Sequence, residues 1–189
     1  MYLLFLFLVA TILANSQTLG TLKSFEDLLY NDTILDNYAI VIDAGSTGSR
    51  AFVYKFSKYV IFERPADDRN ITSTPCGKAR PGLSTFTTHP DDTVAYITPL
   101  LMNAAEVIPP DKHKYTKIYI KGTAGMRVLE NRDQLALWKV LSYGLNGMEK
   151  FPFTVKKETC FGTIDGYREA YYAVLSSNYL EGTIDGNLK

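Results

Sequence analysis

The chain of 189 residues has few of the side chains from which metal centres and thiol-dependent sites are built, with only two cysteines and two histidines. It contains no HExxH pair, no paired CxxC, no GxSxG nucleophile elbow and no P-loop ending in Gly-Lys-Ser/Thr. Zinc sites and the hydrolase classes that depend on these motifs therefore lack support. Excess charge is absent too, because 20 Lys and Arg balance 20 Asp and Glu. This balance gives no reason to expect nucleic acid or an anionic membrane surface as a partner.

The amino terminus also lacks charged side chains. Residues 1–14 are almost wholly apolar. Ala14 at the end of this run and Ser16 place small residues at the two positions that a signal peptidase reads. We predict a signal peptide over 1–16, cleaved before Gln17, and a secreted or lumenal protein of the secretory pathway. An uncleaved membrane anchor is the alternative, with an apolar run shorter than the about 20 residues that span a bilayer. Residues 17–189 contain no repeat or linker and suffice for one domain.

Two further features fit the secretory pathway. Asn31 and Asn70 each begin a glycosylation sequon, which is used only in that compartment. An even number of cysteines in an oxidising compartment favours a disulfide, here between Cys76 and Cys160. The alternative is that each cysteine pairs with a part of the protein outside this sequence.

The most informative stretch is a glycine-rich turn between two predicted strands. The run 38–42 is continuously apolar, as expected of a strand buried on both faces, and 51–56 alternates like a second strand. Gly45 and Gly48 allow the amides between them to converge on one anion. The same turn carries the hydroxyl groups of Ser46, Thr47 and Ser49. An ordinary hairpin is the alternative to a phosphate-binding turn. Asp43 weighs against that alternative, because a carboxylate that ends a buried strand is costly unless it is paired or holds a cation.

Helices and strands alternate after this hairpin. Apolar residues recur at helical spacing from Asp91 until Pro109 and Pro110 end the helix. A strand over 117–121 then turns into a helix over 123–129. The remaining expected elements are strands at 59–62 and 153–157, helices over 132–142 and 166–180, and a loop across 64–90. This order indicates an α/β domain, with an opening β-meander in a mixed sheet and flanking helices.

Four segments resemble, in order, the motifs of the apyrase family of nucleoside tri- and diphosphate diphosphohydrolases. They are 41–50 (VIDAGSTGSR), 80–84 (RPGLS) leading into 91–101, 121–129 (KGTAGMRVL), and 165–172 (DGYREAYY) continuing to 182. The resemblance covers residues 38–182. It implies a ribonuclease H-like lobe of the actin-like ATPase superfamily.

The resemblance also implies a role for each matching residue. Asp43 would hold Mg²⁺ or Ca²⁺, and Glu169 would be the general base that activates water. The residues that would bind the phosphates of a nucleoside di- or triphosphate are Ser46, Thr47, Gly48, Ser49, Thr123 and Ala124. For Arg127, a structural ion pair is favoured over a phosphate contact. The third motif departs most from the family pattern, at Asp165, Ala170 and Val174, and Gly122 replaces the usual Ala in the second.

The resemblance implies that residues 17–189 are the amino-terminal lobe of a longer enzyme. In the family, a carboxy-terminal lobe completes the active site, and its aspartate and Gly-Gly-Ala-Ser turn are not found in 183–189. We therefore expect this missing lobe to be the main partner and the chain alone to turn over slowly or not at all. Two alternatives stay open: a secreted non-catalytic module that binds nucleotide or protein, and a lobe of another actin-like phosphotransferase.

Overall fold

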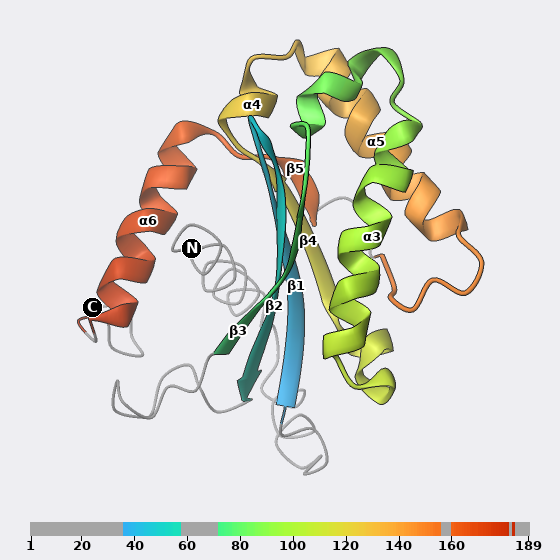
Figure 1. The fold of residues 1–189 in the computed structure, drawn as a ribbon. Helices are drawn as coiled ribbons and strands as arrows, with labels where there is room; N and C mark the ends of the chain where they lie inside the picture. The colour runs from blue at the N-terminus through green and yellow to red at the C-terminus, as the bar shows by residue number, and fades with distance from the viewer. Residues whose placement is uncertain (1–35, 58–71, 156–159, 182, 184–189) are drawn as a thin grey trace, which may run out of the picture.

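The fold is built on a five-stranded mixed sheet with flanking helices (Figure 1). The computed structural model describes residues 36–57, 72–155, 160–181 and 183. The strands are β1 (Asp36–Gly45), β2 (Gly48–Ser57), β3 (Thr72–Ala79), β4 (Lys117–Gly122) and β5 (Phe161–Thr163), in the order β3-β2-β1-β4-β5. Strand β2 pairs antiparallel with both β1 and β3. Strand β4 is parallel to β1, and β5 is parallel to β4. This arrangement confirms the predicted opening meander in a mixed sheet.

Helices cover both faces of the sheet. The two long helices α3 (Asp92–Val107) and α5 (Asn131–Gly147) lie on one face, and α6 (Gly166–Leu180) lies on the other (Figure 1). Short connections complete the fold: the 3-10 helices η2 (Leu83–Thr88) and η3 (Pro110–Tyr115) and the single turn α4 (Ala124–Arg127). Within the described residues, no helix combines the length and the apolar character needed to cross a membrane.

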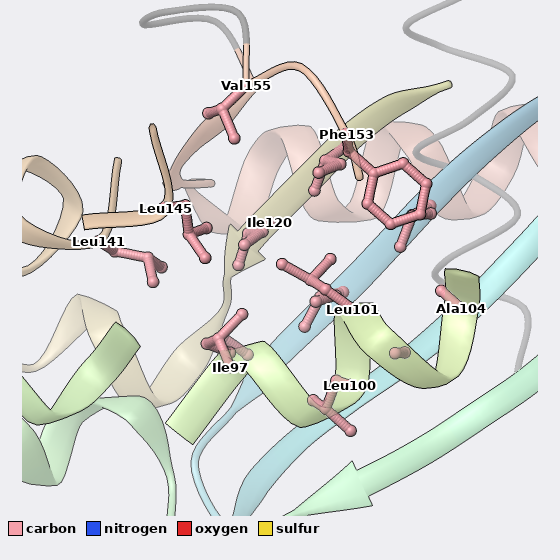
Figure 2. Close-up of a cluster of buried hydrophobic side chains, with 14 of the residues drawn as sticks. Ile97, Leu100, Leu101, Ala104, Ile120, Leu141, Leu145, Phe153 and Val155 are labelled. Carbon is pink, nitrogen blue, oxygen red and sulfur yellow. The ribbon is translucent and has the colours of Figure 1, made fainter. Parts of the chain in front are cut away.

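The central strand β1 is buried on both faces, as its continuous apolar run predicted. Ile40, Ile42 and Ala44 belong to the large cluster under α3 and α5, part of which Figure 2 shows. Ala39 and Val41 belong to a smaller cluster on the opposite face. Because side chains alternate along a strand, Asp43 projects toward the face that α6 covers.

Two of the expected elements are wrong. The loop expected across 64–90 contains β3 and η2, which sequence patterns missed because only Cys76 of β3 is buried and Pro75 interrupts the strand. Such composition is tolerated on an edge strand. Conversely, Phe153 and Val155 do not lie in a strand, and the next strand, β5, follows later in the chain. The two residues are buried in the core cluster beside the helices, as Figure 2 shows, and this burial explains the alternation of apolar residues that suggested a strand.

The predicted bridge between Cys76 and Cys160 is also wrong within this chain. Both cysteines are free thiols, buried in different clusters on opposite faces of the sheet. Cys76 lies in the edge strand β3 and Cys160 directly precedes the other edge strand β5. Four strand spacings separate these edges by about 19 Å, well beyond the roughly 7 Å limit between the Cα atoms of a disulfide.

Several other predictions lie outside the described residues. They are the signal peptide over 1–16, the strand at 59–62, and the sequons at Asn31 and Asn70.

Candidate active site

The carboxyl end of β1 places Asp43 at the edge of the core. Its side chain is 12% exposed, and Arg50 on the neighbouring strand approaches it, with 3.7 Å between Nη1 and Oδ2. The other oxygen, Oδ1, is buried and has no hydrogen-bond partner in the described part of the chain. Burial raises the pKa of Asp43, Arg50 opposes this effect, and the nearby Glu169 carboxylate adds to it. An unsatisfied, buried carboxylate oxygen is suited to receive a cation.

The turn that joins β1 to β2, residues 45–48, is held between two glycines from distant parts of the chain; we call it the phosphate turn. A Cβ on Gly82 would lie 2.3 Å from Ser46 O, and one on Gly125 would lie 2.5 Å from Ser46 Cα. Gly48 meets a similar limit, because its Cβ would lie 2.4 Å from Ala79 O. The glycines thus permit close backbone approach, which fixes the turn at the end of the sheet.

The structure separates the predicted hydroxyl ligands of the phosphate turn. Ser46 and Thr47 are exposed at its tip, but Ser49 is fully buried on the α3 side. The Ser49 amide donates to the Tyr96 hydroxyl, and that hydroxyl lies 3.2 Å from Ser49 Oγ. Tyr96 also lies within hydrogen-bond distance of Ala79 O, so it ties β2 to β3 beneath the turn. Ser49 therefore supports the turn from below rather than facing the solvent.

The second predicted phosphate contact follows β4. Thr123 precedes α4 and makes no side-chain cap, and its amide donates to Ala44 O, so this segment is joined to the end of β1. Ala124 is exposed. Because α4 is only one turn long, any phosphate contact here rests on individual amide and hydroxyl groups rather than on a helix dipole. The departure at Gly122 has a steric reason: its Cβ would lie 2.4 Å from Met126 Cγ.

Glu169 reaches the same end of the sheet from α6. Asp165 caps this helix, since its Oδ1 accepts a hydrogen bond from the amide of Arg168 at 2.7 Å. Glu169 Oε2 accepts from Arg127 Nη1 at 2.6 Å, and the same nitrogen donates to Ile164 O at 3.1 Å. The ion pair favoured for Arg127 is thus present, and its partner is the candidate base itself. It joins α4 to the first turn of α6.

Sequence reasoning did not single out Lys121, which lies in β4 directly beside Asp43 in the parallel register. The pKa of Lys121 is lowered from its ordinary 10.5 to about 8, mainly because the side chain is buried; Cys160 opposes this shift and the positive charge of Arg168 adds to it. The only sequence signal was its place at the start of the second motif. The site therefore carries two carboxylates among several cations.

The residues fit a cation that takes few ligands from the protein. No group of three or more His, Cys, Asp or Glu side chains arranged for a metal occurs in the part of the chain that the structure describes. One unsatisfied Asp43 oxygen is nevertheless the kind of ligand that Mg²⁺ uses, since that ion keeps several waters and commonly binds one or two carboxylates with substrate phosphates.

Comparisons with known proteins identify the family. A model described as the GDA1/CD39 (nucleoside phosphatase) family matches residues 31–188. The curated ectonucleoside triphosphate diphosphohydrolase 7 of Xenopus tropicalis is 36% identical over 172 residues, covering 87% of this chain and 28% of that protein. The guanosine-diphosphatase of Candida albicans is 37% identical over 155 residues, covering 81% of this chain and 24% of that protein. The chain thus spans about a quarter of the length of these curated relatives.

Solved structures give the fold. The crystal structure of nucleoside triphosphate hydrolases from Neospora caninum aligns with a TM-score of 0.55 and 16% identity, covering 86% of this chain and 35% of that chain. Together with the strand order, this likeness confirms the ribonuclease H-like, actin-like fold.

Proposed function

The chain belongs to the GDA1/CD39 nucleoside phosphatase family, and from this membership we propose that it is part of an enzyme that hydrolyses the terminal phosphate of nucleoside di- and triphosphates. The reaction would be cation-dependent and use water as the nucleophile. The observation that carries the proposal is the meeting of Asp43, the phosphate turn and Glu169 at one end of the sheet. The remainder of the enzyme would complete the site with a second lobe.

Each residue has a distinct task in this proposal. The phosphate turn, which is exposed at Ser46 and Thr47, and the segment at Thr123 and Ala124 would bind phosphate oxygens through amide and hydroxyl donors. Asp43 would hold Mg²⁺ or Ca²⁺ through Oδ1, and the bound cation would neutralise charge on the phosphate oxygens. Ser49 would keep the turn in place through Tyr96.

Glu169 would act on the attacking water. Its Oε2 is held by Arg127, and its Oε1 makes no hydrogen bond within the described part of the chain. That oxygen would accept the proton of a water placed in line with the terminal phosphate as the new P–O bond forms. The products would be phosphate and a nucleotide shortened by one phosphate. This role favours a water-using phosphohydrolase over a phosphotransferase or a non-catalytic module.

The proposal is tested by phosphate release from ATP, ADP, GDP and UDP by the native protein, with Mg²⁺, with Ca²⁺ and with EDTA. Asp43→Ala should lower the cation-dependent rate by at least roughly 10²-fold, whereas Asp111→Ala, at an exposed carboxylate in η3, should leave it unchanged. Wild-type rates in Asp43→Ala at ordinary Mg²⁺ would remove Asp43 from the cation site.

The proposed location is the secretory pathway, either secreted or lumenal. The predicted signal peptide and the two sequons support it. Mass spectrometry of the mature protein should find an amino terminus at or near Gln17, whereas an intact Met1 would support a membrane anchor.

A further inference from the structure

Four charged side chains form a single row across the sheet. Lys121 of β4 is the register partner of Asp43, Asp43 is the partner of Arg50, and Arg50 is the partner of Lys78 in β3. Register partners on neighbouring strands project from the same face, so the row lies on the α6 side of the sheet. The row contains three cations and one carboxylate, and Arg50 and Lys78 lie on the side of Asp43 that leads to the β3 edge of the sheet.

A further cation, Arg80, extends the row at the edge of the sheet. Its Cγ lies 3.2 Å from the position that a Cβ on Gly48 would take, so its stem lies over the end of the phosphate turn. The charge of Arg80, then partial desolvation, then the charge of Arg50 lower the pKa of the exposed Lys78, so Lys78 lies near both arginines. Within the described residues, neither Lys78 nor Arg80 forms an ion pair.

We propose that Lys78 and Arg80, continuing from Arg50, bind the linked phosphates that follow the terminal one and so select phosphate chains over single phosphates. The inference rests on the proposed function for the position of the terminal phosphate at the phosphate turn. Two strand spacings, about 10 Å, separate the backbones of Asp43 and Lys78, a length comparable to that of a triphosphate. A chain of linked phosphates would relieve the repulsion between Lys78 and the two arginines, and it would satisfy donors that have no acidic partner among the described residues.

The test measures binding without turnover. The native protein carrying Glu169→Gln is titrated calorimetrically in EDTA and low salt with orthophosphate, inorganic tripolyphosphate and ATP. Lys78→Gln/Arg80→Gln should weaken the binding of tripolyphosphate and ATP by about tenfold, and that of orthophosphate by less than about twofold. The matched control is Lys117→Gln, an exposed lysine at the opposite end of β4, which should change none of the three.

The outcomes separate this inference from the proposed function. Equal weakening for orthophosphate and tripolyphosphate, or no weakening for either chain, would overturn the role of the row. Weakening for tripolyphosphate alone would support it and identify inorganic chains as the ligand. Failure of the proposed function has a different signature, which is phosphate release that survives Glu169→Gln in the presence of Mg²⁺.

Discussion

The ion pair between Arg127 and Glu169 gives the sharpest structural prediction. The Arg127 Nη1 atom donates to Glu169 Oε2 at 2.6 Å and to Ile164 O at 3.1 Å. The side chain of Arg127 is 33% exposed and that of Glu169 is 24% exposed. A charge-assisted hydrogen bond in a partly buried setting contributes about 1.5–3 kcal/mol. Arg127→Ala should therefore weaken the attachment of α6 by about 2 kcal/mol, allowing for the solvent exposure of the pair.

The matched control is another arginine pair on the surface. Arg132 Nε lies 3.2 Å from Glu130 Oε2, but these side chains are 82% and 74% exposed. Because solvent screens exposed pairs, Arg132→Ala should change local stability by less than about 0.5 kcal/mol.

Hydrogen–deuterium exchange of the α6 amides measures the effect in the native protein. A loss of about 2 kcal/mol corresponds to roughly 30-fold faster exchange through local opening. Arg127→Ala should show this acceleration, Arg132→Ala should not, and adding Glu169→Gln to Arg127→Ala should produce little further change because the partner is already lost. Equal exchange in both arginine variants would refute the conclusion that this pair positions Glu169.

Three further predictions concern stability and thiol chemistry. Gly125→Ala places a Cβ 2.5 Å from a backbone carbon of the phosphate turn. This variant should lower the free energy of unfolding by about 1–3 kcal/mol, measured by thermal unfolding, and it should weaken phosphate binding. The control is Gly147→Ala, whose Cβ has nothing within 4 Å and which should change neither quantity. The pKa of Lys121 is lowered to about 8, mainly by burial, so the unfolded chain keeps the Lys121 proton to a higher pH than the folded chain does. The free energy of unfolding of wild type, relative to that of Lys121→Met, should therefore rise as the pH rises from 8 to 10.5. A difference between the two proteins that stays constant over this pH range would contradict the burial of Lys121. Thiol titration without reductant should find Cys76 and Cys160 unbridged to each other, and a tryptic peptide joining them would contradict the sheet order.

The sequence predicted the parts of the fold where one signal is strong. The apolar run of β1 and the helical spacing of α3 were both identified, because each depends on local periodicity. The edge strand β3 was missed, since an edge exposes most of its side chains and tolerates Pro75. The disulfide was predicted from parity alone, which carries no information on the distance between two cysteines.

The candidate site was predictable in its members but not in their arrangement. The motif match named Asp43 and Glu169, but no sequence pattern shows that Arg127 pairs with Glu169 or that Oδ1 of Asp43 is left unsatisfied. The position of Ser49 also follows from three dimensions, because the side chain alternates to the α3 face and meets Tyr96, 47 residues away. The charged row became visible only through the register of four strands.

Turnover of nucleoside di- and triphosphates by Glu169→Gln, in the native protein with Mg²⁺, decides whether the carboxylate on α6 takes part in hydrolysis. If Glu169 takes the proton from the attacking water, kcat should fall by roughly 10²–10⁴-fold while KM changes little. A kcat near that of wild type would contradict the account, because the carboxylate that α6 and Arg127 hold at the end of the sheet would then have no part in the chemistry.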